Sequence, residues 1–293
     1  LSLASGSGTT KLLHPTVADN TNVTVTLSGE VTAATNARKC CLGASCSVAN
    51  FCTTNFKQAG FVFSNTSSGA TTPVPTQVAG TASTPYLRAL QTDTTTGACT
   101  ARLTSQQTVK MAYKCVNPAT CISGQTFTVD STNIQSNANA ASPIYSDVNL
   151  AFNSDGSAPI PITYSDVGQI ELLASLFLPA ANGNPDYTLT GASSFVVKPY
   201  TLYPTITSNP GTSATGNGFV SAGTNFQVKV EARNSQGALT PNFGNEGETI
   251  SLENLTLVYP SSGGTATTLS LGSGFTATTP VGTFVNNTVS WKQ

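Results

Sequence analysis

The chain has 293 residues, a net charge of −1 and only 9% charged residues, and 39% of its residues are hydrophobic. This length suffices for two domains with cores of their own. Its 12 basic and 13 acidic residues are scattered singly, without the basic stripe that binds nucleic acid or the polybasic patch that binds anionic membranes. The best apolar run, residues 170–181, is shorter than the about 20 residues of a spanning helix. We therefore expect neither nucleic-acid binding nor membrane insertion.

The N-terminal segment, residues 1–35, contains one alternating stretch at 22–27 that is typical of a β-strand. We expect this segment to be the end of a preceding domain or a strand segment that packs on the next one. Because it lacks a Met, a basic start and a long apolar stretch, either a leader has been removed or residue 1 lies inside a longer polypeptide. The only histidine, His14, lies here, so a Ser–His–Asp triad has no other candidate.

Seven cysteines follow, and none lies beyond residue 121. They are Cys40, Cys41, Cys46, Cys52, Cys99, Cys115 and Cys121. Zinc would need Cys-x-x-Cys pairs or histidines, so we expect no metal site and instead expect disulfides formed in an oxidising compartment. Adjacent cysteines in a strand point to opposite sides, so the first two should have different partners. Because seven is odd, one thiol is free, pairs with another chain, or pairs with a cysteine outside this sequence.

Residues 99–115 alternate between apolar and polar side chains, which predicts a hairpin that turns near residues 106–107. Cys99 and Cys115 then lie on the same face and opposite each other, so a disulfide between them is one prediction. A disulfide from Cys115 to Cys121, closing a short loop, is the alternative.

Short alternating stretches continue along the chain, separated by Pro, Gly, Asn and Ser. The predicted strands are residues 60–64, 86–90, 126–129, 148–152, 159–164, 195–199, 225–232, 249–259 and 287–291. Residues 168–178 fit a buried strand or a helix, and the Asn-Ser-Asp-Gly stretch at 153–156 predicts a turn. This pattern predicts an all-β chain of tandem immunoglobulin-like β-sandwich domains, the first stapled by disulfides.

A Pro-, Gly-, Ser- and Thr-rich stretch at 199–210 predicts a domain boundary. We expect residues 36–200 to form the cysteine-stapled sandwich and residues 204–293 a second immunoglobulin-like sandwich. The last predicted strand has no successor that would close its sheet, so we expect the second sandwich to be incomplete because the chain is a fragment. The alternative is an open sheet edge that accepts a strand from another subunit.

Residues suited to catalysis are sparse. Glu246 and Glu248 lie close together in a Gly-rich stretch, which is weak support for acid–base chemistry. Asn153 and Asp155 could ligate calcium but lack the spacing of an EF-hand, so a turn is the better interpretation. No Gly-rich phosphate-binding loop occurs. We therefore expect no enzymatic activity and no cofactor.

Several blocks of the sequence resemble the large conserved region of MshQ-like proteins, bacterial proteins associated with the biogenesis of the MSHA-type type IV pilus. The blocks are PTQVAG at 75–80, YLRA at 86–89, TGACTARL at 96–103, YKCVNP at 113–118, YSDVG at 164–168, AGTNF at 222–226 and TPNFGNE at 240–246. The resemblance covers residues 36–293. It implies a large secreted or surface-exposed protein, often with a lectin-like domain elsewhere, and it supplies no catalytic residues.

The resemblance implies a non-enzymatic, exported cell-surface protein, part of a pilus-associated adhesin or tip protein whose sandwiches act as stalk or adhesive platform. The implied partners are pilus or minor pilin subunits, further copies of the chain, or a surface glycan. Low charge and an open sheet edge keep a self-assembling extracellular filament or surface-layer subunit, using strand donation, as an alternative. A carbohydrate-binding module is a further alternative.

Overall fold

A computed structural model describes residues 21–26, 39–42, 45–48, 51–56, 59–92, 99–180, 186–207, 220–221, 223–246, 269–270, 275–278 and 282–291. Every regular element in these ranges is a β-strand, so the all-β prediction is confirmed. Within these ranges no helix is long and apolar enough to cross a membrane.

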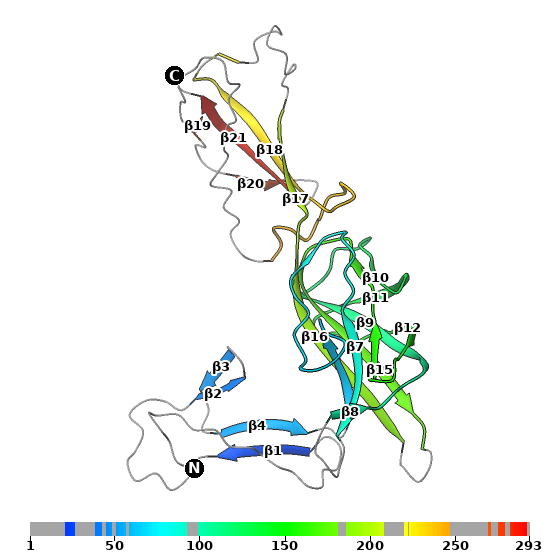
Figure 1. Ribbon diagram of the computed structural model, residues 1–293. Coiled ribbons are helices and arrows are strands. Elements are labelled where there is room, and N and C mark those ends of the chain that lie inside the picture. The colour runs from blue at the N-terminus through cyan, green and yellow to red at the C-terminus, as the bar shows by residue number, and fades with distance from the viewer. Residues whose placement is uncertain are drawn as a thin grey trace, which may run out of the picture.

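The strands, labelled in Figure 1, are β1 (Thr21–Thr26), β2 (Lys39–Leu42), β3 (Ser45–Val48), β4 (Phe51–Phe56), β5 (Ala59–Ser64), β6 (Gln77–Val78), β7 (Tyr86–Thr92), β8 (Cys99–Ala101), β9 (Gln106–Asn117), β10 (Phe127–Val129), β11 (Thr132–Ala138), β12 (Ser146–Ala151), β13 (Ser157–Pro159), β14 (Ile162–Tyr164), β15 (Gly168–Leu178), β16 (Tyr187–Lys198), β17 (Thr201–Ile206), β18 (Asn225–Arg233), β19 (Leu269–Ser270), β20 (Thr276–Thr278) and β21 (Thr283–Trp291).

The first sandwich is built from two sheets that share one core. The larger sheet has the order β14-β10-β11-β9-β15-β16-β6, with β12 also paired to β9, and the smaller has the order β13-β7-β5, with β8 also paired to β7. The largest fully buried side chains are Tyr113, Phe127, Leu87, Met111, Leu150, Ile160, Ile170, Leu172, Leu189, Val109, Val129 and Val148. They come from both sheets, as expected when alternate residues of two facing sheets point inward.

The burial pattern of β15 explains why residues 168–178 form a strand and not a helix. Ile170, Leu172 and Ala174 are buried in the core, whereas Gln169 is exposed on the other face. This burial has a period of two, which a strand satisfies and a helix does not. The whole of β15 pairs antiparallel with β16, and β9 pairs on its other side. Of the two alternatives left open for residues 168–178, the structure shows the buried strand.

The predicted hairpin at residues 99–115 is wrong. β8 pairs with β7 in the smaller sheet, whereas β9 begins at Gln106 and pairs with β11, β12 and β15 in the larger sheet. The chain crosses between the sheets at residues 102–105, where Leu103 is buried. The alternation was misleading because two strands in different sheets both point residues at one core.

The turn predicted at residues 153–156 is confirmed between β12 and β13. The Gly156 N–H donates to the Asn153 carbonyl at 2.9 Å, and Gly156 has a φ of 78°. Asp155 Oδ1 accepts hydrogen bonds from the N–H and the hydroxyl of Ser157, at 3.0 and 2.6 Å. These bonds lower the pKa of Asp155. The carboxylate is thus used in the turn, as the turn interpretation expects.

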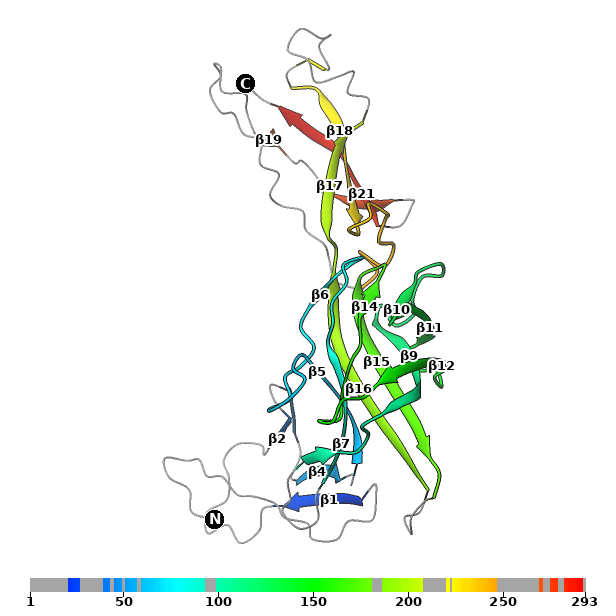
Figure 2. The same ribbon diagram turned by 45° about the vertical axis from the view of Figure 1, so that its right-hand side comes forward.

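The sheet of the second domain has the order β17-β18-β21-β19, with β20 also paired to β21. Its buried core residues are Val228, Val230 and Val289, a cluster separate from the first core. Figures 1 and 2 show this sheet stacked end to end with the first sandwich, and the chain runs from β16 directly into β17 along one side of both. The strand predicted at 249–259 lies outside the described residues.

Among the described strands, β17 forms one edge of the second domain's sheet, and the short strands β19 and β20, both paired to β21, form the opposite edge. The Thr207 N–H donates to the Gln227 carbonyl. In this register the backbone N–H and C=O groups of the odd-numbered residues of β17 point toward β18, and those of the even-numbered residues point away from it. The backbone nitrogen of Pro204 therefore faces the free edge, where it offers no donor to an added strand. Proline at such a position is common on edge strands and weakens edge-to-edge pairing.

Two further strand pairs lie N-terminal to the first sandwich. β1 pairs with β4, and β2 pairs with β3, in each case antiparallel. The β2–β3 register places Cys41 opposite Cys46.

Gly191 on β16 provides a test of how closely the two sheets approach. A Cβ atom there would lie 2.4 Å from the carbonyl oxygen of Phe61 on β5 and 2.7 Å from its Cβ atom. We expect Gly191→Ala to lower the free energy of unfolding by about 1–3 kcal/mol, because backbone must shift to make room. Ala192→Ser, on the exposed face of the same strand, should change it by less than about 0.5 kcal/mol. Chemical denaturation measures both, and equal stabilities would contradict this packing.

Candidate functional site

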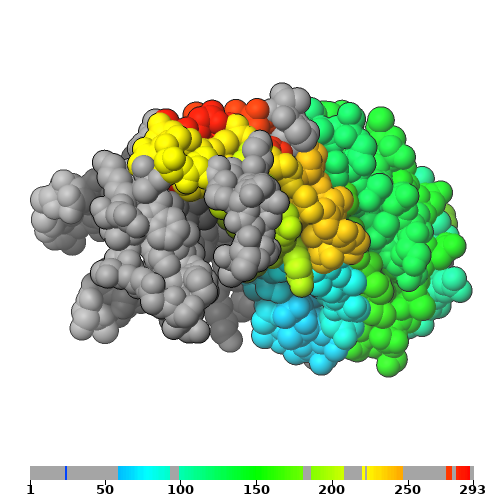
Figure 3. Space-filling model, turned by 90° about the horizontal axis from the view of Figure 1, so that it is seen from above, coloured from blue at the N-terminus to red at the C-terminus, as the bar shows by residue number. Residues whose placement is uncertain are grey.

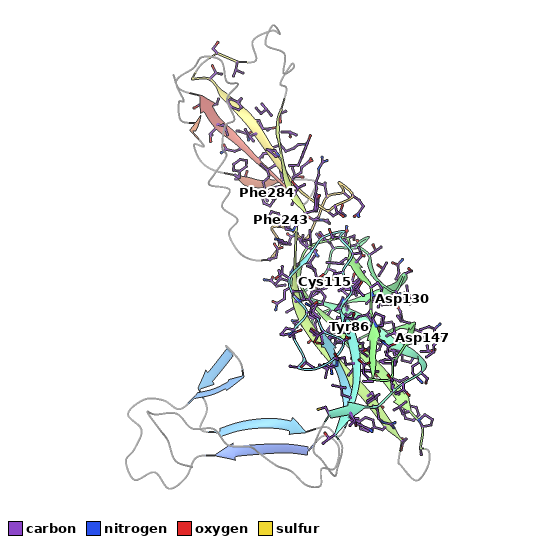
Figure 4. All side chains as sticks on the ribbon, in the orientation of Figure 1. Tyr86, Cys115, Asp130, Asp147, Phe243 and Phe284 are labelled. Carbon is purple, nitrogen blue, oxygen red and sulfur yellow. A yellow bond between two sulfur atoms is a disulfide. The ribbon has the colours of Figure 1, made fainter. Side chains whose placement is uncertain are left out.

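The described residues contain a dense buried polar cluster where the second domain meets the first. The loop that follows β18, residues 234–246, lies against the end of the first sandwich. Figure 3 shows this loop in orange beside the cyan and green residues of the first sandwich, and Figure 4 places Phe243 between Phe284 above it and Cys115 below. We call this region the domain junction.

Three segments of the first domain form its side of the junction. They are residues 79–80 after β6, residues 115–122 at the end of β9, and residues 164–168 between β14 and β15. The second of these is closed by a disulfide between Cys115 and Cys121, whose Cα atoms are 5.4 Å apart. Gly168 has a φ of 119°, and a Cβ atom there would lie 2.6 Å from the Asn117 carbonyl oxygen, so the turn and the disulfide-closed loop are in direct contact.

Asp166 lies at the centre of the junction and has no solvent-exposed surface. Its Oδ1 atom accepts a hydrogen bond from the Val167 N–H at 2.8 Å. The Asn242 N–H, from the second domain, is shared between Oδ1 and Oδ2, each at 3.2 Å. A carboxyl group of the first domain thus holds the backbone of the second.

Asn242 is also fully buried, and its side-chain amide bonds three groups of the first domain. Its Nδ2 donates to the Val167 carbonyl at 3.1 Å and to the Tyr164 hydroxyl at 3.2 Å. Its Oδ1 accepts from the Ile122 N–H at 3.1 Å. One side chain therefore connects the turn, the core and the disulfide-closed loop, and all its polar atoms have partners.

A second group of contacts lies beside the first and involves residues 234–236. Asn234 Nδ2 donates to the Ser165 carbonyl at 2.9 Å, and its Oδ1 accepts from the backbone of its own loop. The Ser235 N–H donates to the Ala79 carbonyl at 3.0 Å, and Gln236 Nε2 donates to the Gly80 carbonyl at 2.8 Å. A Cβ atom on Gly80 would lie 2.1 Å from Gln236 Oε1, so only glycine fits without rearrangement.

Aromatic side chains support the polar cluster from both sides. Tyr113, Phe127 and Tyr164 are in mutual contact, with ring centroids 5.1 to 5.6 Å apart. Phe243 packs against the first core and meets Phe284 of β21 edge to face at 5.7 Å. Phe243 thus connects the first hydrophobic core to β21 of the second domain.

Burial dominates the electrostatics of the junction. It raises the pKa of Asp166 to about 7, against the lowering effect of the Val167 and Asn242 backbone bonds, and the nearby charge of Glu246 raises it further. Burial also raises the pKa of the Tyr164 hydroxyl. It raises the pKa of Tyr113 as well, against the lowering effect of a hydrogen bond with Ser136. Since Cys115 is disulfide-bonded, the Tyr164 hydroxyl can only donate toward its sulfur, 3.9 Å away. These groups fill a buried interface between the two domains.

The structure separates the predicted cysteines into distinct roles. Cys115 pairs with Cys121, whereas Cys99 on β8 is exposed and free, so the predicted Cys99–Cys115 disulfide is wrong. The cause is the sheet change described above, which places β8 and β9 in different sheets. The side chains of the other four, Cys40, Cys41, Cys46 and Cys52, lie outside the described part of the chain.

In the part of the chain that the structure describes, the remaining sequence candidates are not brought together in one site. His14 and Glu248 lie outside the described residues. Glu246 accepts a hydrogen bond from the Gly244 N–H at 2.7 Å, within its own loop. The described residues contain no cluster of three or more His, Cys, Asp or Glu side chains that could hold a metal ion.

Sequence reasoning did not identify Asp166, Asn234 or Asn242 as a site. Residues of this type look like turn formers when they are met in loops. Their blocks were nevertheless visible: PTQVAG, YKCVNP, YSDVG and TPNFGNE, quoted above for the MshQ-like resemblance, all contribute residues to the junction.

Cys99 and the Cys115–Cys121 disulfide predict a labelling pattern. A thiol reagent applied to the native chain should modify Cys99, which is exposed, while peptide mapping recovers Cys115 and Cys121 as one linked pair. Cys99→Ser should remove that label and leave the linked pair intact. Recovery of Cys99 in a disulfide with Cys115 or Cys121 would contradict the structure.

Replacing Asn242 tests how much the junction contributes to the free energy of unfolding. Asn242→Ala removes the side chain that bonds the buried Val167 carbonyl and the partly buried Ile122 N–H, so we expect a loss of about 2–4 kcal/mol in the free energy of unfolding. Asn245→Ala, in the same loop but exposed, removes only a bond to the Pro241 carbonyl and should cost less than about 1 kcal/mol. Denaturation curves that shift equally for both variants would show that Asn242 is not a buried connector.

Comparison with known families agrees with this architecture. The family model described as "Domain of unknown function (DUF6701), first Ig-like domain" matches residues 37–192, and the model described as "DUF6701, second domain" matches residues 193–287. No curated protein and no solved structure is significantly similar to the chain. The boundary between the two matches falls inside β16, whose pairing with β6 continues to Lys198. The immunoglobulin-like all-β prediction is thereby confirmed, and the chain belongs to the DUF6701 family.

Proposed function

We propose that this chain is a section of an MshQ-like bacterial surface protein, in which two immunoglobulin-like domains form a stiff stalk. The observation that carries the proposal is the domain junction, where Asp166 and Asn242 are both fully buried and bonded across the domain boundary. Domains in one chain move relative to each other unless their interface holds them. Here the interface is held by backbone and side-chain bonds and by Phe243.

The arrangement suits a load-bearing element. β16 runs into β17 along one side of both domains. Tension along the chain would therefore pass directly from the larger sheet of the first sandwich to the sheet of the second domain. The contacts of residues 234–236 and of Asn242 lie on the loop that returns to the first domain, and they would have to break before the domains separate. The Cys115–Cys121 disulfide closes the loop that bonds Asn242, which limits how far the loop can deform.

The proposal includes an extracellular location, a non-enzymatic role and contacts with pilus or minor pilin subunits. A disulfide is typical of exported proteins, and a sequence with only 9% charged residues that is rich in Thr and Ser suits an extracellular β-protein. Four of the seven blocks that resemble MshQ-like proteins, PTQVAG, YKCVNP, YSDVG and TPNFGNE, contribute residues to the junction, which links the resemblance to the architecture. A glycan ligand would be bound by another part of such a protein.

Self-assembly by strand donation is the weaker candidate. Its best acceptor among the described strands is β17, the longest edge strand of the second domain's sheet, and Pro204 removes a donor from the middle of that edge.

The surface role is tested in a bacterium that encodes the chain. Antibodies against it should label intact cells, and immunogold particles should lie on or beside pili. Loss of the label in a strain without the pilus genes supports pilus association, whereas labelling only after permeabilisation would refute the surface role.

The stalk role predicts a narrow distribution of molecular shapes. Small-angle X-ray scattering of the full chain should give one extended shape, and the double variant Asn234→Ala/Gln236→Ala should broaden it because both bonds to the first domain are lost. The matched double variant Gln107→Ala/Asn149→Ala, away from the junction, should leave the scattering unchanged. Equal scattering from all three proteins would mean that these contacts do not hold the domains.

A further inference from the structure

The junction contains a buried acid without a compensating base. Asp166 is fully buried, and the donors to its carboxyl group are the backbone N–H groups of Val167 and Asn242. In the part of the chain that the structure describes, neither a lysine nor an arginine forms an ion pair with it. If the carboxyl group ionises, its charge lies in a buried interface without a counter-charge, an arrangement that favours the neutral form.

The groups that face Asp166 add no positive charge. Tyr164 on its own turn and Tyr113 on β9 are neutral hydroxyls. From the second domain, the facing titratable group is Glu246, which is itself acidic. The loop closed by Cys115 and Cys121 contributes a disulfide that does not titrate. When both carboxyl groups are ionised, two negative charges on different domains oppose each other.

We propose that Asp166 makes the domain junction a pH-responsive hinge, which is closed in mildly acidic medium and opens more often as the pH approaches neutrality. The hinge opens when the loop at residues 240–246 withdraws from the turn at 164–168 and exposes the carboxyl group to water. This property concerns the junction alone and holds whatever role the protein has at the cell surface.

The direction follows from the two protonation equilibria. In the closed junction burial raises the pKa of Asp166 from 3.8 to about 7, whereas in the open junction the exposed group titrates near its ordinary value. The closed state therefore binds the proton more tightly, and its added stability is complete below pH 3.8. That stability is lost progressively as the pH rises, and the loss is complete above about pH 7.

Hydrogen exchange of the full chain tests the hinge, because two junction amides are protected only when it is closed. The Asn242 N–H bonds Asp166, and the Ile122 N–H bonds Asn242. After correction for intrinsic exchange, we expect their protection to fall on the order of tenfold per pH unit between pH 5 and 7 and to level off above that. The amide of Leu172, inside β15, should keep its protection throughout.

Two variants separate the role of Asp166 from general destabilisation. Asp166→Asn keeps a hydrogen-bond acceptor but cannot ionise, so the pH dependence at both amides should disappear. Glu246→Gln should keep most of the dependence, because burial rather than Glu246 is the main cause of the altered titration. The hinge is refuted if protection at both amides is independent of pH, or if Asp166→Asn retains the same slope.

A measurement on the unmodified chain decides the matter even if Asp166→Asn does not fold. Carbon NMR follows the titration of the Asp166 carboxyl group directly. A midpoint near 7, which falls toward 4 in Asn242→Ala because the opened junction admits water, supports the hinge. A midpoint near 4 in the unmodified chain would overturn it.

Discussion

The buried pair of Asp166 and Asn242 is the constraint on which the arrangement of the two domains depends. Both residues are removed from water, so each of their polar atoms needs a partner. Asp166 has one partner on its own domain, the Val167 N–H, and one on the second domain, the Asn242 N–H, whereas the partners of the Asn242 side chain lie on the first domain. Satisfying them fixes the turn at 164–168, the loop at 240–246 and the disulfide-closed loop relative to one another. A shift of one segment would leave a buried polar group unpaired, which is unfavourable by about 1–3 kcal/mol per group.

The hydrophobic contacts reinforce this constraint. The first core is large and draws on both sheets, whereas the buried cluster of the second domain is small in the described residues. Phe243 belongs to the second domain but packs on the first core and on Phe284 of β21, so a side chain of the second domain is anchored in the larger core. The structure therefore explains how a domain with a small buried cluster holds a defined position at the end of a larger one.

The sequence predicted the local structure well because strands leave a periodic trace. The alternation at residues 225–232 and the buried run at 168–178 each correspond to a strand, β18 and β15. The hairpin at 99–115 failed because alternation reports which face of a strand is buried but not which sheet it joins. The Asp166–Asn242 contact joins residues 76 apart, and its members resemble ordinary turn residues, so no local pattern could predict it. The sequence did mark both residues in another way, because Asp166 lies in YSDVG and Asn242 in TPNFGNE, two of the blocks that resemble MshQ-like proteins.

Nitrogen-15 NMR relaxation of the full chain at pH 5 tests the central claim most directly, because it reports how each domain tumbles. If the Asp166–Asn242 connection holds the domains together, strands β15 and β18 will share one rotational diffusion tensor, that of a single elongated body. Separate and faster tumbling of the two domains would contradict the account, since a buried connection between them could not then persist.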